Sequence, residues 1–331
     1  ITGDGIGPEL SESAVSILET LHDKLGVKTK IISLEAGDMA LEKYGHALPD
    51  ETFQSVKSSD ACLKAPVGES AADVIVVLRR KLDLFANIRP AKSYPNTPAL
   101  REDIDLVIVR ENTEDLYTGQ EFELEDSAVA MRIITEKASK RIAKLAFEMA
   151  SQRDGKKRVT CVHKSNVMRK TDGLFSKSCE SVAKEFASIK FDQMYVDACS
   201  MNLIREPQEF DVIVTTNLFG DILSDESSQV VGGLGMAPAA NIGDSFGLFE
   251  PVHGAAFDIA GKQIANPTSF ILSMKMMLEW LGIKNNDQNS SDAAKMLEDT
   301  VLNIVKSGIT TKDIGGTMST REFTNKIIER L

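Results

Sequence analysis

The stretch Asn217-Leu218-Phe219-Gly220-Asp221-Ile222-Leu223-Ser224-Asp225 comes directly after the apolar run 210–216. The run is typical of a buried strand, and a helix that starts after it would place Asp221 and Asp225 on one face, with Cβ atoms about 5–6 Å apart. Two carboxylates so placed repel each other unless a hard divalent cation such as Mg²⁺ or Mn²⁺ binds both. Two acids on a solvated helix face, near the positive end of the helix dipole, explain the same spacing, so other segments must decide.

Short apolar runs alternate with amphipathic stretches along most of the chain, which predicts an α/β fold. The predicted strands are 29–33, 61–65, 106–109, 159–163, 194–196 and 212–215, and helical periodicity covers 9–25, 135–151, 173–187, 267–281 and 293–307. The segment Val74-Ile75-Val76-Val77-Leu78 is ambiguous. Its β-branched residues favour a strand, whereas the alanines before it and the basic residues after it favour a helix.

The composition is that of an ordinary globular protein with room for two domains or one large one, at 331 residues with 42% hydrophobic and 26% charged. A formal net charge of -11 without a basic run argues against nucleic-acid binding. The chain contains no apolar stretch of about 18 residues, so no membrane span is predicted. The four cysteines lack metal-ligand spacing, so we expect free thiols in a reducing cytoplasm. Because Ile1 looks like the middle of a strand, we expect a few residues to precede it.

Two nucleotide-binding motifs are absent. The segment Gly3-Asp4-Gly5-Ile6-Gly7-Pro8-Glu9 has its glycines spaced G-x-G-x-G, without the third position of the Rossmann fingerprint. No G-x-x-x-x-G-K-[ST] sequence occurs, which disfavours a P-loop NTPase. The four histidines have no zinc-ligand spacing either.

Three arginines, Arg79, Arg89 and Arg110, end or follow apolar stretches. Guanidinium groups bind carboxylates in a bidentate way, so the three could clamp a small dianion, although each alone is equally typical of a surface ion pair. If the ambiguous segment is helical, Ile75 and Val76 share the face of Arg79 and offer an apolar wall beside the clamp. Ordinary core packing is the alternative for these two aliphatic residues.

Tyr117 and Lys164 are candidates for a general acid and a general base, and Asp197 is a carboxylate that could pair with Lys164 or a metal. Tyr and Lys titrate near pH 10 when unperturbed, so neighbouring charges would have to tune them, and most such residues are structural. The glycine-containing loop 248–262 would let backbone approach a ligand closely. Asp258 in this loop could accept both ribose hydroxyls of NAD and repel a 2′-phosphate.

Together these segments resemble the β-decarboxylating dehydrogenase family, which includes isocitrate and isopropylmalate dehydrogenases. The matching pieces are 3–9, 78–90, 109–117, 163–168, 217–225 and 249–266, in family order along the chain. The resemblance implies a two-domain α/β fold that is not a Rossmann fold. A discontinuous domain of residues 1–88 and 233–331 would bind the dinucleotide, and residues 89–232 would form the substrate and dimerisation domain.

The resemblance also implies a homodimer with active sites shared between subunits, and it leaves dimer and tetramer open. In each site Tyr117 would come from one chain and Lys164 and Asp197 from the other, while Asp221, Asp225 and the second chain's Asp197 would bind Mg²⁺ or Mn²⁺. The substrate would be a small 2-hydroxy dicarboxylic acid held by Arg79, Arg89 and Arg110. The residues implied to bind NAD are Ile6, Asn166, Glu250, His253, Gly254, Ala255, Ala256, Asp258 and Asn266.

The substrate is implied by the residues that precede Arg79. Isocitrate dehydrogenases place a Ser and an Asn six and four residues before this Arg, where the chain has Asp73 and Ile75, and some homoisocitrate dehydrogenases place an Arg where it has Val76. The apolar pair suits the isopropyl group of 3-isopropylmalate. Ala72 stands where bacterial isopropylmalate enzymes commonly carry Glu, so the pattern is most similar to an archaeal subgroup.

Two alternatives stay open. Homoisocitrate, isocitrate or D-malate could be the substrate, alone or in a bifunctional enzyme, because an extra methylene changes selectivity by only about 1–3 kcal/mol. In another class, the chain could be a non-catalytic regulatory subunit. Such subunits usually lose part of the Tyr, Lys and Asp set, which this chain retains.

Overall fold

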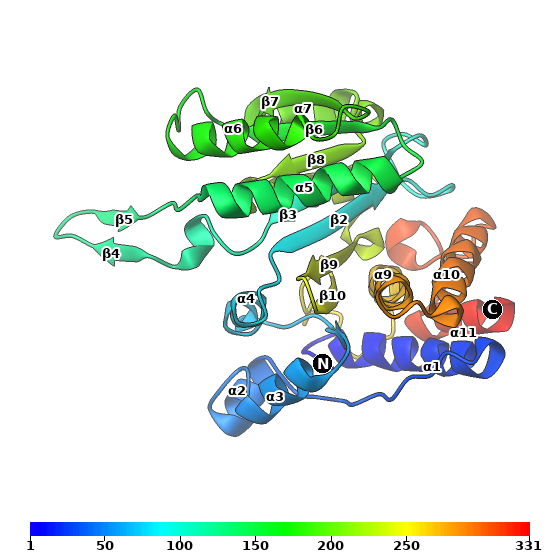
Figure 1. The fold of residues 1–331 in the computed structure, drawn as a ribbon. Coiled ribbons are helices and arrows are strands. Elements are labelled where there is room, and N and C mark those ends of the chain that lie inside the picture. Colours follow the sequence, from blue (N-terminus) through cyan, green and yellow to red (C-terminus); the bar gives the residue numbers. More distant parts are fainter.

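The computed structural model describes residues 1–331. Its strands are β1 (Cys62–Leu63), β2 (Ala86–Lys92), β3 (Asp105–Glu111), β4 (Glu121–Glu123), β5 (Ala128–Ala130), β6 (Arg158–His163), β7 (Lys190–Tyr195), β8 (Val212–Thr215), β9 (Pro238–Ile242) and β10 (Gly247–Pro251). Eight of them form one sheet in the order β1-β10-β9-β2-β3-β8-β6-β7, whereas β4 and β5 form a hairpin that projects as a separate arm (Figure 1).

Helices lie on both faces of the sheet (Figure 1). They are α1 (Gly7–Leu25), α2 (Asp38–Tyr44), α3 (Asp50–Ser58), α4 (Ala71–Lys81), α5 (Glu136–Gln152), α6 (Thr171–Ala183), α7 (Val196–Arg205), α8 (Asn217–Val230), α9 (Thr268–Asn285), α10 (Gln288–Lys306) and α11 (Thr320–Arg330). Four short 3-10 helices complete the list: η1 (Leu116–Thr118), η2 (Pro207–Glu209), η3 (Leu234–Met236) and η4 (Lys312–Ile314).

The strand directions define one functional edge. β3, β8, β6 and β7 are parallel to one another, so their carboxyl ends meet at the same edge of the sheet, where open α/β sheets bind ligands. β2 runs antiparallel to both β3 and β9. β9 and β10, from late in the chain, thus continue a sheet whose other half comes from its middle. This mixed topology confirms the predicted α/β fold and differs from a Rossmann sheet.

The alternation of side chains along the parallel strands divides the core. Val107 and Val109 of β3 pack with Phe147 of α5 on one face, whereas Leu106 and Ile108 pack with residues of α7 and α8 on the other. Successive strand residues point to opposite faces, so both faces of a buried strand carry aliphatic residues. Arg110 follows the same alternation and lies on the face of α8, which brings its guanidinium to the quoted stretch.

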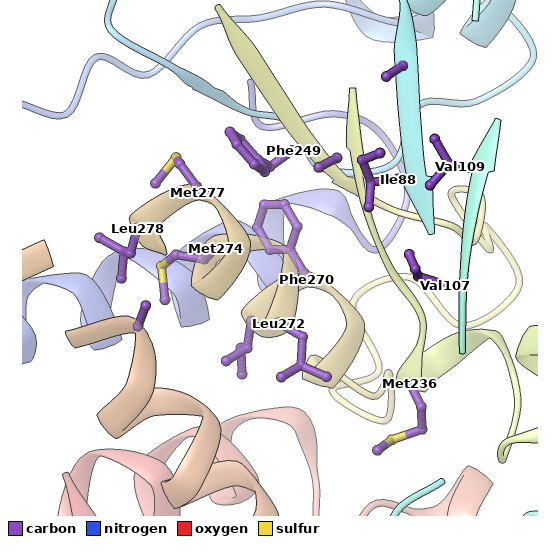
Figure 2. Close-up of a cluster of buried hydrophobic side chains, with 14 of the residues drawn as sticks. Ile88, Val107, Val109, Met236, Phe249, Phe270, Leu272, Met274, Met277 and Leu278 are labelled. Atoms are coloured by element: carbon purple, nitrogen blue, oxygen red, sulfur yellow. The ribbon is translucent and has the colours of Figure 1, made fainter. Parts of the chain in front are cut away.

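A second part of the core forms around α9. Figure 2 shows Phe270, Met274 and Met277 of this helix beside Phe249 of β10 and near Ile88 of β2. α1 and α10 pack against the other side of α9, and α11 packs against α1 and α10 (Figure 1). α9 is apolar around most of its circumference because it is surrounded by other elements, as expected for a central helix.

The structure decides the ambiguous segment and corrects one predicted strand. Residues 74–78 lie in the helix α4, whose last turn carries Arg79, Arg80 and Lys81 at the negative end of the helix dipole. The predicted strand 29–33 is wrong, because this segment contains no regular structure. Ile31 and Ile32 are about half exposed, and no backbone hydrogen bond pairs this segment with a strand; the neighbouring Leu34 carbonyl accepts the Thr2 N–H at 3.1 Å. An apolar alternating run forms a strand only where another strand pairs with it.

The predicted division into two domains stays a prediction, because the sheet runs through the proposed boundary at β2, which pairs with β3 on one side and β9 on the other. No helix is long and apolar enough to cross a membrane.

Candidate active site

The quoted stretch starts α8 immediately after β8, as its pattern predicted. Asn217, Asp221 and Ser224 recur at helical spacing and all bind arginine side chains. Asp225 follows on the same face, four residues after Asp221. The two acids therefore do not lie on a plain solvated surface: they face a cluster of buried guanidinium groups.

Arg110 of β3 lies flat against the first turns of α8. Its Nε and Nη2 donate to Asn217 Oδ1 at 2.9 and 2.7 Å, and Nη1 forms an ion pair with Asp221. Gly220 makes this approach possible, since a Cβ atom there would lie 2.5 Å from Arg110 Cγ. The glycine in the quoted stretch is therefore required for the clamp rather than for a turn.

Arg89 of β2 binds the next turn of the same helix. Its Nη1 donates to Ser224 Oγ at 2.8 Å and to Asp225 Oδ1 at 3.2 Å, and its Nη2 lies 3.5 Å from Asp221 Oδ1. Its Nε donates to Asn87 Oδ1 at 2.8 Å, two residues earlier on the same face of the strand. Both acids of α8 thus contact guanidinium groups of neighbouring strands.

Arg79 of α4 joins the cluster through buried amides. Its Nε donates to Asn241 Oδ1 at 2.8 Å, and the Nδ2 atoms of Asn87 and Asn112 donate to the same oxygen at 2.7 and 3.0 Å. Asn241 Nδ2 in turn donates to Glu250 Oε1 at 2.8 Å. Asn241 stands opposite Asn87, and Asn87 opposite Arg110, so sheet register aligns these groups in one row.

Burial and charge act against each other on the ionisable groups. Burial lowers the pKa of Arg79 to about 10, while Glu250 opposes the shift, so the guanidinium stays charged at neutral pH. Burial raises the pKa of Asp221, but Arg110 and Arg89 lower it more, and the net shift is downward. The carboxylate of Asp221 is therefore ionised and available as an oxygen ligand.

Tyr117 stands beside this pair in the 3-10 helix η1. Its hydroxyl donates to Asp221 Oδ2 at 2.5 Å, and the Arg110 guanidinium lies 5.0 Å from its ring centre. Burial raises the pKa of Tyr117 above its ordinary value, and the Asp221 carboxylate adds to the rise. The phenol therefore keeps its proton at neutral pH, which suits a proton donor.

Lys164 and Asp197 follow the ends of β6 and β7 and form an ion pair with each other. Hydrogen bonding to Lys164 lowers the pKa of the exposed Asp197. Within one chain Asp197 does not join Asp221 and Asp225, since no cluster of three metal-ligand side chains occurs. The structure thus brings Tyr117 together with the acids of α8 and keeps Lys164 with Asp197 in a separate group.

The predicted cofactor residues lie in several settings. The Ile6 N–H donates to the Ala255 carbonyl at 2.8 Å, so the glycine-rich start of the chain supports the loop after β10. The N–H groups of residues 253–256 have no acceptor within the chain. Gly254, Ala256 and Asp258 are exposed in this loop, as is Asn166 in the loop after β6.

Three other predicted cofactor residues are more buried. Glu250 pairs with Lys64 at 2.8 Å and Arg79 at 3.4 Å; burial raises its pKa, but these cations lower it further, to about 2. Asn266 donates to Asp313 and accepts from the Thr268 N–H at the start of α9. His253 Nε2 is buried without a partner. The side chains of Glu250 and Asn266 are therefore already engaged in supporting the fold.

Comparison with known proteins fits this arrangement. The model of the isocitrate/isopropylmalate dehydrogenase family matches residues 1–327. The chain belongs to this family. It is 51% identical over 329 residues to a 3-isopropylmalate dehydrogenase of Saccharolobus solfataricus, covering 99% of the chain and 97% of the relative. It is 45% identical to an isocitrate/homoisocitrate dehydrogenase of Thermus thermophilus, covering 100% of the chain and 97% of the relative.

The fold agrees with the same family. The crystal structure of isocitrate dehydrogenase from Methylococcus capsulatus superposes with a TM-score of 0.92 at 42% identity, covering 99% of this chain and 97% of the other. The chain is therefore an oxidoreductase with the fold of this family, and its similarity to archaeal 3-isopropylmalate dehydrogenases confirms the predicted subgroup.

Several residues of the candidate site were not recognised from the sequence. Asn217 and Ser224 could have been found, because they recur with Asp221 at helical spacing in an otherwise apolar segment. Asn87 precedes Arg89 by two residues and so shares its face of the strand. Asn241 gave no local signal, since the three residues that donate to its Oδ1 are more than 100 residues away in the sequence.

Proposed function

We propose that the chain catalyses the NAD-linked, divalent-metal-dependent oxidative decarboxylation of (2R,3S)-3-isopropylmalate to 4-methyl-2-oxopentanoate and CO₂, a step of leucine biosynthesis. The observation that carries the proposal is the convergence of Arg89 and Arg110 on the acids of α8, with Tyr117 bonded to Asp221. Arg79 joins this set through Asn241 and Asn87. This set supplies cations for two carboxylates, oxygen ligands for a metal and a proton donor in one place.

The charges of the cluster support an exchange of ion-pair partners when the metal and the substrate bind. The three arginines and Lys64 face three carboxylates, Asp221, Asp225 and Glu250, so the cluster carries one net positive charge. A divalent cation and a dianionic substrate add no net charge. The acids of α8 can then bind the metal while the arginines bind the substrate carboxylates, which avoids leaving a buried charge unpaired.

The donor set fits a hard divalent cation. Asp221 and Asp225 offer carboxylate oxygens, the ligands that Mg²⁺ and Mn²⁺ prefer, and the partner subunit's Asp197 would complete the protein ligands. When bound, such a cation polarises the substrate hydroxyl and the carboxylate beside it.

The loop after β10 fits a dinucleotide. Its free N–H groups at residues 253–256 can donate to ligand oxygens, and the exposed Asp258 can accept ribose hydroxyls. When bound, NAD accepts the hydride from the carbon that carries the hydroxyl. The exposed Asn166 belongs to the loop of Lys164, so a cofactor contact there would come from the partner subunit.

Two side chains of this chain move protons. Lys164, as the neutral amine, takes the hydroxyl proton while the carbinol carbon loses its hydride and the alcohol becomes a ketone. The bond from the neighbouring carbon to its carboxylate then breaks, and that carboxylate leaves as CO₂. Tyr117, kept protonated by its surroundings, donates a proton to that neighbouring carbon. The arginine cluster holds the substrate carboxylates until one of them leaves as CO₂, and it stabilises the negative charge that develops.

Exposed apolar side chains support a homodimer with shared sites. Met201 and Ile204 of α7 and Ile222 of α8 are each more than half exposed, on helices that carry Asp197 and Asp221. Phe122 and Leu124 of the β4–β5 arm are about half exposed as well. Covering these surfaces with a second chain buries apolar area and brings a second Lys164–Asp197 pair toward the α8 acids.

Four buried free cysteines support a cytoplasmic location.

The choice of substrate rests on α4. Ile75 and Val76 are half-buried one turn before Arg79, and neither can bond the third carboxylate of isocitrate. Ile75 also packs partly against the core of this region. Competition kinetics on 3-isopropylmalate, homoisocitrate, isocitrate and D-malate with NAD and Mg²⁺ test the choice. A higher kcat/KM for isocitrate than for 3-isopropylmalate contradicts it, and a homomer inactive on all four acids favours a regulatory subunit.

Mixed dimers test the shared site. A Lys164→Met subunit paired with a Tyr117→Phe subunit has one site with both native residues and one with neither. We expect both parent homodimers to be nearly inactive and the mixed dimer to recover about half of the native turnover. Recovery close to zero would show that both residues come from one chain.

The cofactor is tested at Asp258. Asp258→Ala removes the acceptor for the ribose hydroxyls and the repulsion of a 2′-phosphate, so the KM for NAD should rise and the preference for NAD over NADP should fall. An unchanged preference removes the reason for assigning the residue.

A further inference from the structure

A buried ion pair links the two groups of candidate catalytic residues. Arg132, which follows β5, binds Asp115 through Nε at 2.6 Å and through Nη2 at 3.2 Å, and its Nη1 binds Asp172. Its Nη2 also donates to Thr216 Oγ1 at 2.8 Å. Both aspartate side chains are fully buried and the arginine is 11% exposed. One guanidinium thus ties the segments after β3 and β8 to the start of α6.

Asp115 holds the segment of Tyr117 and the start of α8. Its Oδ1 accepts the Leu116 N–H at 2.9 Å and so caps η1, the short helix that carries Tyr117. Its Oδ2 accepts the Leu218 N–H at 3.1 Å, in the first turn of the helix that carries Asp221 and Asp225. The positions of the candidate proton donor Tyr117 and of the candidate metal ligands on α8 therefore depend on this one carboxylate.

Asp172 holds the segment of Lys164 in the same way. Its Oδ2 accepts the Lys164 N–H at 2.5 Å, and its own N–H donates to the Met168 carbonyl. No other cation pairs with Asp172. Without Arg132, a buried carboxylate would remain beside the backbone of the candidate base with only hydrogen bonds to balance its charge.

Strain at Asp115 indicates that this geometry is not chosen for stability. Its φ of 71° with ψ of −146° is a conformation that non-glycine residues rarely adopt, at a cost of about 1–3 kcal/mol. Buried ion pairs add little net stability, because both partners lose their hydration. Such strained and desolvated arrangements persist where the surrounding contacts fix a functional position.

We infer that Arg132 is a positioning residue that sets Tyr117 and Lys164 relative to each other through Asp115 and Asp172. The inference rests on the proposed function. In the proposed dimer these two residues work in different active sites, so a single Arg132 supports both: the proton donor of its own site and the base of the neighbouring one.

Substitution of Arg132 tests the role. Arg132→Met should lower kcat about 10- to 100-fold, because a displacement of about 1 Å costs this much, with the KM values for 3-isopropylmalate and NAD nearly unchanged. Arg132→Lys should recover part of the loss, since an ammonium keeps the charge but cannot bind both carboxylates in the fork geometry. Should Arg132→Met fail to fold, Asp172→Asn offers the same test, because it keeps the side-chain shape and removes the charge.

Arg153→Met is the matched control. Arg153 also joins two aspartates, Asp105 at 2.7 Å and Asp211 at 3.1 Å, far from the candidate site. If the control lowers kcat as much as Arg132→Met does, or if Arg132→Met turns over at the native rate, the inference is wrong. A substrate with deuterium on the carbinol carbon adds a readout: the isotope effect on kcat should change in Arg132→Met and stay native in Arg153→Met.

The mixed dimer tests the contacts through Asp115 and through Asp172 separately. It also distinguishes a failure of the role of Arg132 from a failure of the proposed shared site. Arg132→Met placed in the Lys164→Met subunit disturbs the working site through Asp115, and placed in the Tyr117→Phe subunit it disturbs that site through Asp172. We expect a loss of turnover in both cases. A parent mixed dimer without activity refutes the shared site. If the parent mixed dimer is active and tolerates Arg132→Met in either subunit, the role of Arg132 is refuted and the shared site is not.

Discussion

The two ends of β3 and β8 carry similar ion pairs in different surroundings. At the amino ends, Arg153 joins Asp105 of β3 to Asp211, which directly precedes β8. At the carboxyl ends, Arg132 joins Asp115 to Asp172 and donates to Thr216. Each arginine closes one end of the parallel half of the sheet.

The difference lies in what else the aspartates hold. Asp211 also accepts the N–H of Arg158, at the start of β6, and Asp105 is largely exposed. At the other end, Asp115 and Asp172 bond the backbone beside Tyr117, α8 and Lys164, and Asp115 is strained. Similar ion pairs thus close the sheet at one end and bond the backbone of the candidate reactive groups at the other, because loops surround the ligand at the carboxyl ends of the strands.

The largest effect should come from the candidate base. Lys164→Met removes the group that takes the hydroxyl proton, so kcat on 3-isopropylmalate should fall about 10²- to 10⁴-fold. The melting temperature should stay near the native value, because an exposed ion pair contributes little to stability. Steady-state assays of NADH formation and thermal melts check both. Equal turnover in the variant and the native enzyme would refute the assigned role and weaken the contrast between the two ends.

The next effect tests the packing of the clamp. Gly220→Ala introduces a Cβ atom that would lie 2.5 Å from Arg110 Cγ, so the guanidinium must move and kcat/KM should fall by about 100-fold. Gly173→Ala in α6 is the control, because an added Cβ there meets nothing within 4 Å and alanine should stabilise the helix by up to about 1 kcal/mol. Native kinetics in Gly220→Ala would mean that the clamp tolerates displacement of Arg110.

A smaller effect concerns acid stability. The folded state lowers the pKa of Glu250 from 4.5 to about 2, so it favours the ionised form. The resulting stability, about 3 kcal/mol, is present above pH 4.5 and is lost as the pH falls toward 2. Glu250→Gln should be less stable than the native chain at pH 7, and the difference should shrink on acidification. Urea unfolding at a series of pH values measures it, and a constant difference would contradict the assignment.

The smallest effect on turnover should come from breaking the ion pair at the amino ends of β3 and β8. Arg153→Met leaves the buried Asp211 without its guanidinium, so the free energy of unfolding should fall by about 1–3 kcal/mol. kcat should remain native at temperatures where the variant is folded. Denaturant unfolding and steady-state kinetics on one preparation give both values. A loss of turnover at full folding would mean that the two ends are not functionally distinct.

Much of the candidate site could be predicted from short-range patterns. The spacing of Asp221 and Asp225 after an apolar run predicted that they share a helix face, because helix geometry is local. The three arginines were recognised as a possible clamp because each stands at the end of an apolar stretch. The strand 29–33 failed for the opposite reason: its apolar alternation was local, but a strand also needs a partner.

The sequence by itself determined the family pattern, the candidate site residues and most of the elements that carry them, since helical and strand periodicity act over a few residues. Only the tertiary structure decided that 74–78 is a helix, that Asn241 and Asn87 link Arg79 to Arg89, and that Arg132 joins Asp115 to Asp172. These contacts depend on sheet register and packing between distant segments. Their free energies arise only when burial removes the competing water, which no local pattern records.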